Sequence, residues 1–382
     1  MNSVWEWLKA LFKLKRFWCV LLIPLCVLLT RLAHSRPAAT ERWFSEGIYR
    51  FLTETYGRVF GYLPFSVFQF LIIVFVIAVL WYIGVTVYRL FVKREQCGKY
   101  SRQLLANGAF VVGMVWFMLT IGVGLNYARL EFGEIIGLEI RPSNVEELAV
   151  LTEILVGHAN TLSPQVERNE YGHMIISAGS TFALSQEARV VFRQAGETFP
   201  ALRGFVPHTK PVLYSRLLSQ VRITGVYVPF TMEPHVNVHV PDYHIPATMI
   251  HELAHFRGIM REDEANFIAW LVGYHSGHPD FAYSGTMLAL AHAANQLQRA
   301  CRYSHARVMA QLCETVWVDF RANREYWQQF QGRAAEIGRA ANDAYLRANR
   351  QTDGIYSYGR MVDLLLAYFR NDIYTIIQER DN

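Results

Sequence analysis

Two histidines four residues apart, with a glutamate directly after the first, form the segment of this 382-residue sequence that most clearly indicates chemistry. On a helix, His251 and His255 would project from one face, one turn apart, as two imidazoles must to share a tetrahedral zinc ion. Glu252 would lie about 100° around the helix, beside the metal without binding it. There a carboxylate can take a proton from a zinc-bound water and pass it to a leaving amine. The sequence therefore predicts a zinc (Zn²⁺) site with Glu252 as the catalytic residue.

A third ligand is expected shortly after the second histidine. Gly258 stands where the chain must turn, and two acids follow it, Glu262 and Glu264. Helical spacing places Glu262 on the same face as Asn266, which could orient a histidine, so we predict Glu262 as the ligand and keep Glu264 as the alternative. An apolar side for burying the histidine helix is supplied by Ile250, Leu253 and Ala254.

Other residues of these types carry less information. The pattern of two histidines and nearby acids can also be an ordinary solvated helix face, an alternative that the apolar flanks and the turn disfavour. For His235, His239 and His244 a structural or surface role is the better interpretation. Cys301 and Cys313 could pair in an oxidising compartment, but on one continuous helix they would be about 18 Å apart, too far to bridge.

Three apolar stretches are long enough to cross a bilayer as helices: about 17–33, 65–92 and 104–126. The first follows a basic run and contains Pro24, so it can also be interpreted as a signal peptide; we prefer an uncleaved anchor. The third contains four glycines that would allow close helix packing in lipid, namely Gly108, Gly113, Gly122 and Gly124.

Lys and Arg in the short flanking segments predict the orientation. Basic residues precede the first stretch and lie between the second and third, so both segments are expected to be cytoplasmic. We therefore expect a multi-pass protein of the cell membrane, with residues 1–126 as its membrane region and 127–382 as an extracytoplasmic domain. The net charge of +5 is spread widely without a basic block, which argues against a nucleic-acid partner.

The elements around the histidines predict an α+β fold. A helix is expected over 145–161, with Ser143 or Asn144 as its N-cap, and another over 185–197. The segments RITGVYVPF and VNVHV, within 212–240, read as short strands of a small sheet. After Pro246 the chain is expected to be helical nearly to its end.

At these residues the sequence resembles the gluzincin metallopeptidases, whose second motif E-x-x-A-N stands here as Glu262 to Asn266. It is also similar, over nearly its whole length, to a family of bacterial membrane proteins, domain of unknown function 3810. The segments that carry this likeness are HELAHFRGIMREDEANF, GVYVPFTMEPHVNVHVP and SYGRMVDLLLAYF. One departure is that only six residues separate His255 from Glu262, which requires a tight turn, and Arg261 within it cannot bind zinc.

The resemblance implies a mostly helical, zincin-like domain that hydrolyses peptide bonds in a peptide or protein substrate. It implies further that a strand beside the metal helix binds an extended peptide, for which VNVHVP is the candidate. Tyr358 or Arg360 could stabilise the oxyanion, but packing of an amphipathic C-terminal helix is the preferred role for both. Two alternatives stay open: a non-catalytic zinc-binding sensor or assembly protein, and an amidase that acts on cell-wall peptides. Glu252 favours an enzyme, because zinc binding alone does not need it.

Overall fold

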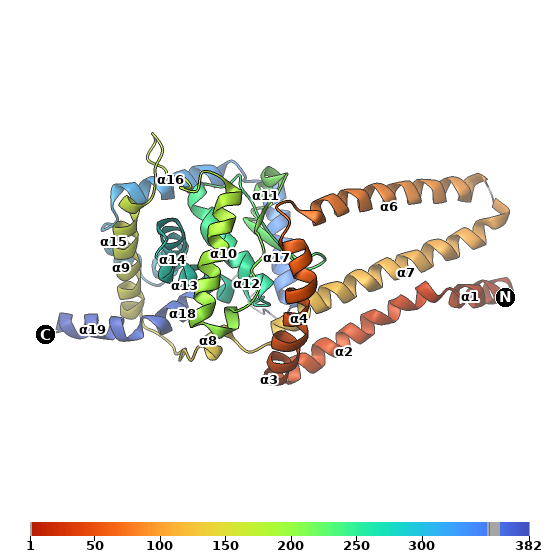
Figure 1. Cartoon of the computed structure of the whole chain (residues 1–382), viewed down its shortest axis with the longest axis horizontal. Coiled ribbons are helices and arrows are strands. Elements are labelled where there is room, and N and C mark those ends of the chain that lie inside the picture. The colour runs from red at the N-terminus through yellow and green to blue at the C-terminus, as the bar shows by residue number, and fades with distance from the viewer. Residues whose placement is uncertain (1, 93, 350, 352–359, 382) are drawn as a thin grey trace. The chain divides into compact units, whose positions relative to one another are not determined.

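The computed structural model describes residues 2–92, 94–349, 351 and 360–381. The described chain is mostly helical, with one small three-stranded sheet (Figure 1), so the α+β class is confirmed at this level. It folds as two compact units. The first comprises Met1–Tyr49, Ser66–Arg129 and Pro229–Thr231; the second comprises Arg50–Phe65, Leu130–Val228 and Met232–Asn382. The division is therefore not a single cut in the sequence.

The first unit contains three helical stretches that are long and apolar enough to cross a membrane. They are Lys15–Ser35, formed by η1 (Lys15–Leu21) and α2 (Leu22–Ser35), then α6 (Val67–Val92) and α7 (Cys97–Gly122). These stretches agree with the three predicted ones to within a few residues at most ends. Preceding them is α1 (Asn2–Phe12), and the chain between the first two stretches is also helical, as α3 (Pro37–Ala39), η2 (Thr40–Tyr49), α4 (Arg50–Leu52), η3 (Thr53–Gly57) and α5 (Arg58–Gly61).

Of the four glycines expected to allow close packing in the third apolar stretch, Gly113 does so against another helix. A Cβ added at Gly113 would lie 2.1 Å from the carbonyl oxygen of Cys19 in η1. Gly122 instead leaves room for Pro229, 2.4 Å from its hypothetical Cβ, whereas Gly108 meets open space and Gly124 only ordinary contacts. Backbone contact between α7 and the first stretch therefore depends on a single glycine.

Gly113→Leu should separate these helices, because no rotamer can relieve a clash between a Cβ and backbone. We expect the variant to lose about 1–3 kcal/mol of stability, the usual effect of overpacking. Thermal unfolding of the full chain in detergent measures the loss. Gly108→Leu is the matched control, and equal melting temperatures for the two variants would contradict the assigned packing.

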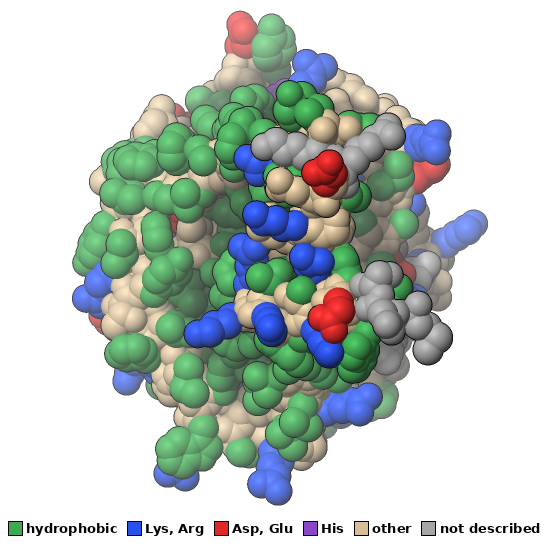
Figure 2. Space-filling model, turned by 90° about the vertical axis from the view of Figure 1, so that its right-hand side faces the viewer, with side chains coloured by type: hydrophobic (Ala, Val, Ile, Leu, Met, Phe, Trp, Pro, Cys, Tyr) green, Lys and Arg blue, Asp and Glu red, His purple; other side chains and the backbone are tan. Residues whose placement is uncertain are grey.

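Basic side chains flank the apolar stretches of the first unit. Figure 2 looks onto the face where α6 and α7 join, and Lys and Arg side chains gather there among hydrophobic ones. Members of this basic set in the sequence include Lys9, Lys13, Lys15, Arg16, Lys99 and Arg102. Which side of a membrane they occupy stays a prediction from their charge.

In the second unit, helices surround the sheet. Its larger helices are α9 (Val145–Leu162), α10 (Thr181–Thr198), α12 (Ile245–Phe256), α13 (Glu262–His275), α14 (Pro279–Ala300), α15 (Arg302–Met309), α16 (Glu314–Gln328), α17 (Arg333–Ala348), α18 (Met361–Tyr368) and α19 (Arg370–Asp381). Shorter ones are η5 (Gly124–Ala128, in the first unit), α8 (Phe132–Ile135), η6 (Ser163–Gln165), η7 (Pro200–Leu202), α11 (Ser215–Gln220) and η8 (Asp242–His244). Helix α9 begins as predicted: the Asn144 side chain accepts from Glu147 N–H while the Glu147 carboxylate accepts from Asn144 N–H. Helix α10 contains the expected 185–197.

The sheet has the order β1–β3–β2, with β1 (Lys210–Pro211) parallel and β2 (Gly225–Val228) antiparallel to the central β3 (Glu233–Val236). The prediction of a strand over VNVHV is wrong beyond Val236. Asn237 Oδ1 accepts a hydrogen bond from His239 N–H (2.9 Å), a local turn that ends the strand. VNVHVP therefore offers no free sheet edge, because it shares only Val236 with the central strand β3 and leaves the sheet after it. The edge strands are β1 and β2.

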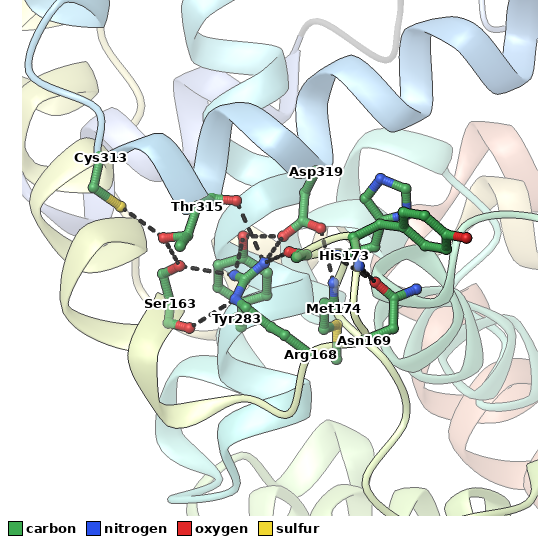
Figure 3. A network of polar contacts seen from close by, with 11 residues as sticks. Ser163, Arg168, Asn169, His173, Met174, Tyr283, Cys313, Thr315 and Asp319 are labelled. Carbon is green, nitrogen blue, oxygen red and sulfur yellow. Dashed lines mark hydrogen bonds and ion pairs between the residues drawn. The ribbon is translucent and has the colours of Figure 1, made fainter.

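A buried polar network fixes the helical side of the second unit (Figure 3). The Asp319 carboxylate in α16 accepts hydrogen bonds from Arg168 Nη1 (3.0 Å), Tyr283 OH (2.5 Å) and the backbone N–H of Met174 (2.9 Å). Arg168 in turn donates to Ser163 Oγ (2.8 Å). These charged groups satisfy one another, so we assign the network to stability rather than chemistry.

Candidate metal centre

The candidate centre is built on two consecutive helices and the turn between them. His251 and His255 lie on α12, and Glu262 is the first residue of α13. Gly258 has a φ of +81°, which a residue with a side chain adopts only with strain, and the Ile259 N–H bonds back to Ala254 C=O (3.1 Å). This reversal is the tight turn that the short spacing required.

The same turn orients one of the histidines. Nδ1 of His255 lies 2.8 Å from the carbonyl oxygen of Ile259, and since a carbonyl only accepts, Nδ1 carries the hydrogen. The unprotonated Nε2 then faces Glu262, 3.7 Å from its Oε1. Burial, followed by the charge of His251, lowers the pKa of His255 to about 4, which keeps this imidazole neutral and able to bind a metal.

The three predicted ligands come together. His251 Nε2 lies 3.2 Å from Glu262 Oε2, and one donor atom from each of His251, His255 and Glu262 lies within 4.8 Å of the others. All three side chains are mostly buried but reach the surface. Among the described residues this is the group of histidines, cysteines and acids placed to hold a metal ion.

Glu264, the alternative ligand, points elsewhere. Its Oε1 accepts a hydrogen bond from the backbone N–H of Phe132 (2.6 Å) and lies 3.6 Å from Arg261. Arg261 also forms an ion pair with Glu131 (2.7 Å). Burial raises the pKa of Glu264 to about 7, which fits a carboxyl sealed against the start of α8 rather than one facing a metal.

Glu252 lies beside the ligands in a tightly enclosed place. It is 3% exposed, and its Oε2 has no hydrogen-bond partner among the described residues. A Cβ on Gly225, the first residue of β2, would lie 2.3 Å from Glu252 Oε1, so the sheet edge runs directly over this carboxyl. Burial, aided by Glu262 and opposed by His251, raises its pKa to about 8, a value suited to exchanging protons near neutral pH.

Asn266 lies one turn after Glu262 and supports His251. Burial alone would lower the pKa of His251, but hydrogen bonds from this imidazole to Glu262 and to Asn266, with the charges of Glu262 and Glu252, raise it. Asn266 is itself buried. The orienting role predicted for Asn266 is therefore consistent with its contact.

Asn266→Ala should weaken the binding of a divalent metal about 10- to 100-fold, because it frees the orientation of a ligand without removing one. Competition with a chromophoric chelator measures the affinity. Asn371→Ala, at an exposed position of α19, is the control. An unchanged affinity in the Asn266 variant would remove this residue from the site.

One histidine near the centre was missed by the sequence analysis. His292 lies on α14, and burial, followed by the charges of Arg299 and His251, lowers its pKa to about 4. A lone histidine in the apolar run LALAHAAN gives no local signal, because its relation to His251 arises only when α14 packs on α12 and α13.

The remaining candidates lie outside the metal group. His235, His239 and His244 contact Glu233 C=O, Tyr326 OH and Asn323 Oδ1, respectively. Arg360 Nη2 donates to Gln351 Oε1 (2.6 Å), and its Nε lies 3.3 Å from Asp263 Oδ2; Tyr358 lies outside the described residues. The Cys301 and Cys313 thiols are free and precede two separate helices, α15 and α16.

Comparison with known proteins gives one match. A family model described as "Protein of unknown function (DUF3810)" matches residues 44–366, which includes the whole candidate centre and α6 and α7. No curated protein and no solved structure matches the chain.

Proposed function

This chain belongs to the DUF3810 family, and from that premise we propose that it is a membrane-anchored, gluzincin-like zinc metallopeptidase that hydrolyses peptide bonds. The observation that carries the proposal is that His251, His255 and Glu262 converge beside a buried carboxyl, that of Glu252. Glu252 is not one of the three possible metal ligands. We place the centre outside the cytoplasm on the charge distribution around the apolar helices.

The donor set fits zinc. Ligand bonds of about 2.0–2.1 Å at tetrahedral angles put neighbouring donor atoms roughly 3.3–3.4 Å apart. The separations of Glu262 from His251 (3.2 Å) and from His255 (3.7 Å) lie on either side of that value, so small side-chain shifts would complete the geometry. Two imidazoles and one carboxylate are the ligands of catalytic zinc sites that keep a position open.

The residues divide the chemistry between them. Zinc, when bound, would supply Lewis acidity for a water molecule and for the substrate carbonyl. Glu252 accepts the proton of the attacking water and then delivers it to the leaving amine. The Oε2 atom of Glu252 has no hydrogen-bond partner among the described residues, and this supports the role because the atom is not committed to a structural contact. The raised pKa of Glu252 is compatible with the same role.

Edge strand β2 is suited to hold the substrate. It pairs with β3 on one side only among the described strands, and it begins at Gly225, in contact with Glu252. An extended peptide that pairs with this edge would bring its backbone to the general base. The absence of a side chain at Gly225 lets the Glu252 carboxyl lie against the backbone of β2.

The full chain, purified in detergent, should hold about one equivalent of zinc and cleave members of a mixed peptide library, and a chelator should abolish cleavage. His255→Ala should hold almost no zinc, while His305→Ala, a histidine outside the centre, should hold it normally. Elemental analysis and mass spectrometry of the products give both readings.

Three results would redirect the proposal. A chain without zinc would contradict it outright. A chain that binds zinc but cleaves no peptide would favour a zinc-binding sensor or assembly protein. Cleavage confined to amides of cell-wall peptides would identify an amidase with the same chemistry.

A further inference from the structure

Residues 50–65 form a segment that is helical up to Gly61 and has an inward face made of small residues. Thr53, Gly57 and Gly61 are buried at intervals of four residues. A Cβ on Gly57 would lie 3.0 Å from the Phe256 ring, and one on Gly61 would lie 2.6 Å from the Phe205 ring. The segment is therefore seated closely on the second unit, and Phe256 is the last residue of the histidine helix α12.

The opposite side of this segment carries large apolar side chains. Phe51, Val59, Tyr62 and Phe65, which we call the outer stripe, are between 57% (Tyr62) and 65% (Val59) exposed. The spacing of Phe51, Val59 and Tyr62 follows helical turns, so these side chains share a face. A helix on the surface of a soluble protein normally buries its large apolar side chains and exposes polar ones, and this segment has the opposite arrangement.

The chain itself indicates what covers the outer stripe. Phe65 is two residues before α6, one of the helices able to cross a membrane, so about 7 Å of chain at most separates it from the start of that helix. Tyr is favoured where a membrane-spanning helix meets the headgroups, because its ring lies in apolar surroundings and its hydroxyl in water, and Tyr62 suits this position.

We propose that the outer stripe lies in the headgroup region of the lipid bilayer, on the side where α6 begins. A single helix, roughly 10 Å across, then separates lipid from the C-terminal end of α12. The inference depends on α6 spanning the membrane and holds whether or not the metal centre is catalytic. If the centre is catalytic, its substrates are peptides at the membrane surface.

Site-directed spin labelling of the full chain in phosphatidylcholine and phosphatidylglycerol vesicles tests this placement. The five cysteines are replaced by serine, and Val59→Cys or Tyr62→Cys carries the label. Accessibility to oxygen, which enters lipid, is compared with accessibility to a water-soluble nickel complex. Leu80→Cys, on the exposed surface of α6, marks lipid, and Tyr303→Cys, 79% exposed on α15, marks water.

We expect labels at 59 and 62 to give a ratio of oxygen to nickel accessibility between those of the two markers. A ratio equal to that at 303 would overturn the proposal, and so would inaccessibility to both reagents, which would identify a protein partner such as a second copy. A label at 80 that meets water would overturn the premise that α6 spans the membrane. If the cysteine-free chain fails to fold, a photo-crosslinking amino acid at Val59 of the wild-type chain should attach lipid, and attachment to protein alone would overturn the proposal.

Discussion

Glu252→Gln should lower peptide hydrolysis by about two to four orders of magnitude, the usual contribution of a general base, and leave the bound zinc unchanged. Glutamine keeps the shape of the side chain but cannot accept a proton. The metal should stay because Glu252 does not belong to the ligand group His251, His255 and Glu262. Peptide cleavage rates and zinc content, measured on the same preparations, give the two values.

The controls separate catalysis from folding. Glu336→Gln, an exposed glutamate on α17, should leave both the rate and the zinc content unchanged. His255→Ala should lose both together. If Glu252→Gln lost zinc as His255→Ala does, Glu252 would be a structural member of the centre, and if the rate were unaffected, Glu252 would not be the base.

The grouping of His251, His255 and Glu262 could be predicted because these residues are close in sequence and follow helical geometry. Gly258 and Glu262 follow His255 by three and seven residues. The structure has the chain reversal at Gly258, and Glu262 is the first residue of the next helix. Helical spacing favoured Glu262 over Glu264 but left both open. The contact of Glu264 with the backbone N–H of Phe132, which is distant in sequence, shows that Glu264 faces away from the histidines.

Elements that depend on distant contacts could not be predicted in the same way. The VNVHV alternation favours a strand, yet the Asn237 side chain also donates to Ile223 C=O (2.9 Å), a partner fourteen residues away, and the chain leaves the sheet. Residues 50–65 lie between two apolar stretches in sequence but pack with residues 205 and 256. The hydropathy of residues 50–65 distinguishes them from the apolar helices on either side. It does not show which surface of the protein they cover.

A buried ion pair joins the sheet to that segment. Lys210 in β1 and Glu233 in β3 are both 0% exposed and form a salt bridge, and Lys210 Nζ also donates to the carbonyl oxygen of Phe60 (2.9 Å). Burial lowers the pKa of Lys210, against the opposing effect of Glu233, so the pair holds its charges in a costly environment. The two groups tolerate burial only together.

Lys210→Met should therefore destabilise the protein by about 3–5 kcal/mol, because it leaves the buried Glu233 carboxylate without this cation. It also removes one of the two donors to Phe60 C=O, the other being the N–H of Leu63. Chemical denaturation of the full chain in detergent measures the free energy of unfolding. Arg302→Met, at an exposed position, should change it by less than about 0.5 kcal/mol. The double variant Lys210→Met with Glu233→Met should recover most of the loss, since removing both charges also removes the cost of burying them.

A single Lys210 variant as stable as the Arg302 control would mean that the pair does not hold the sheet to residues 50–65. In that case the strand edge over Glu252 must be positioned by the remaining contacts of β2 and β3 with α12.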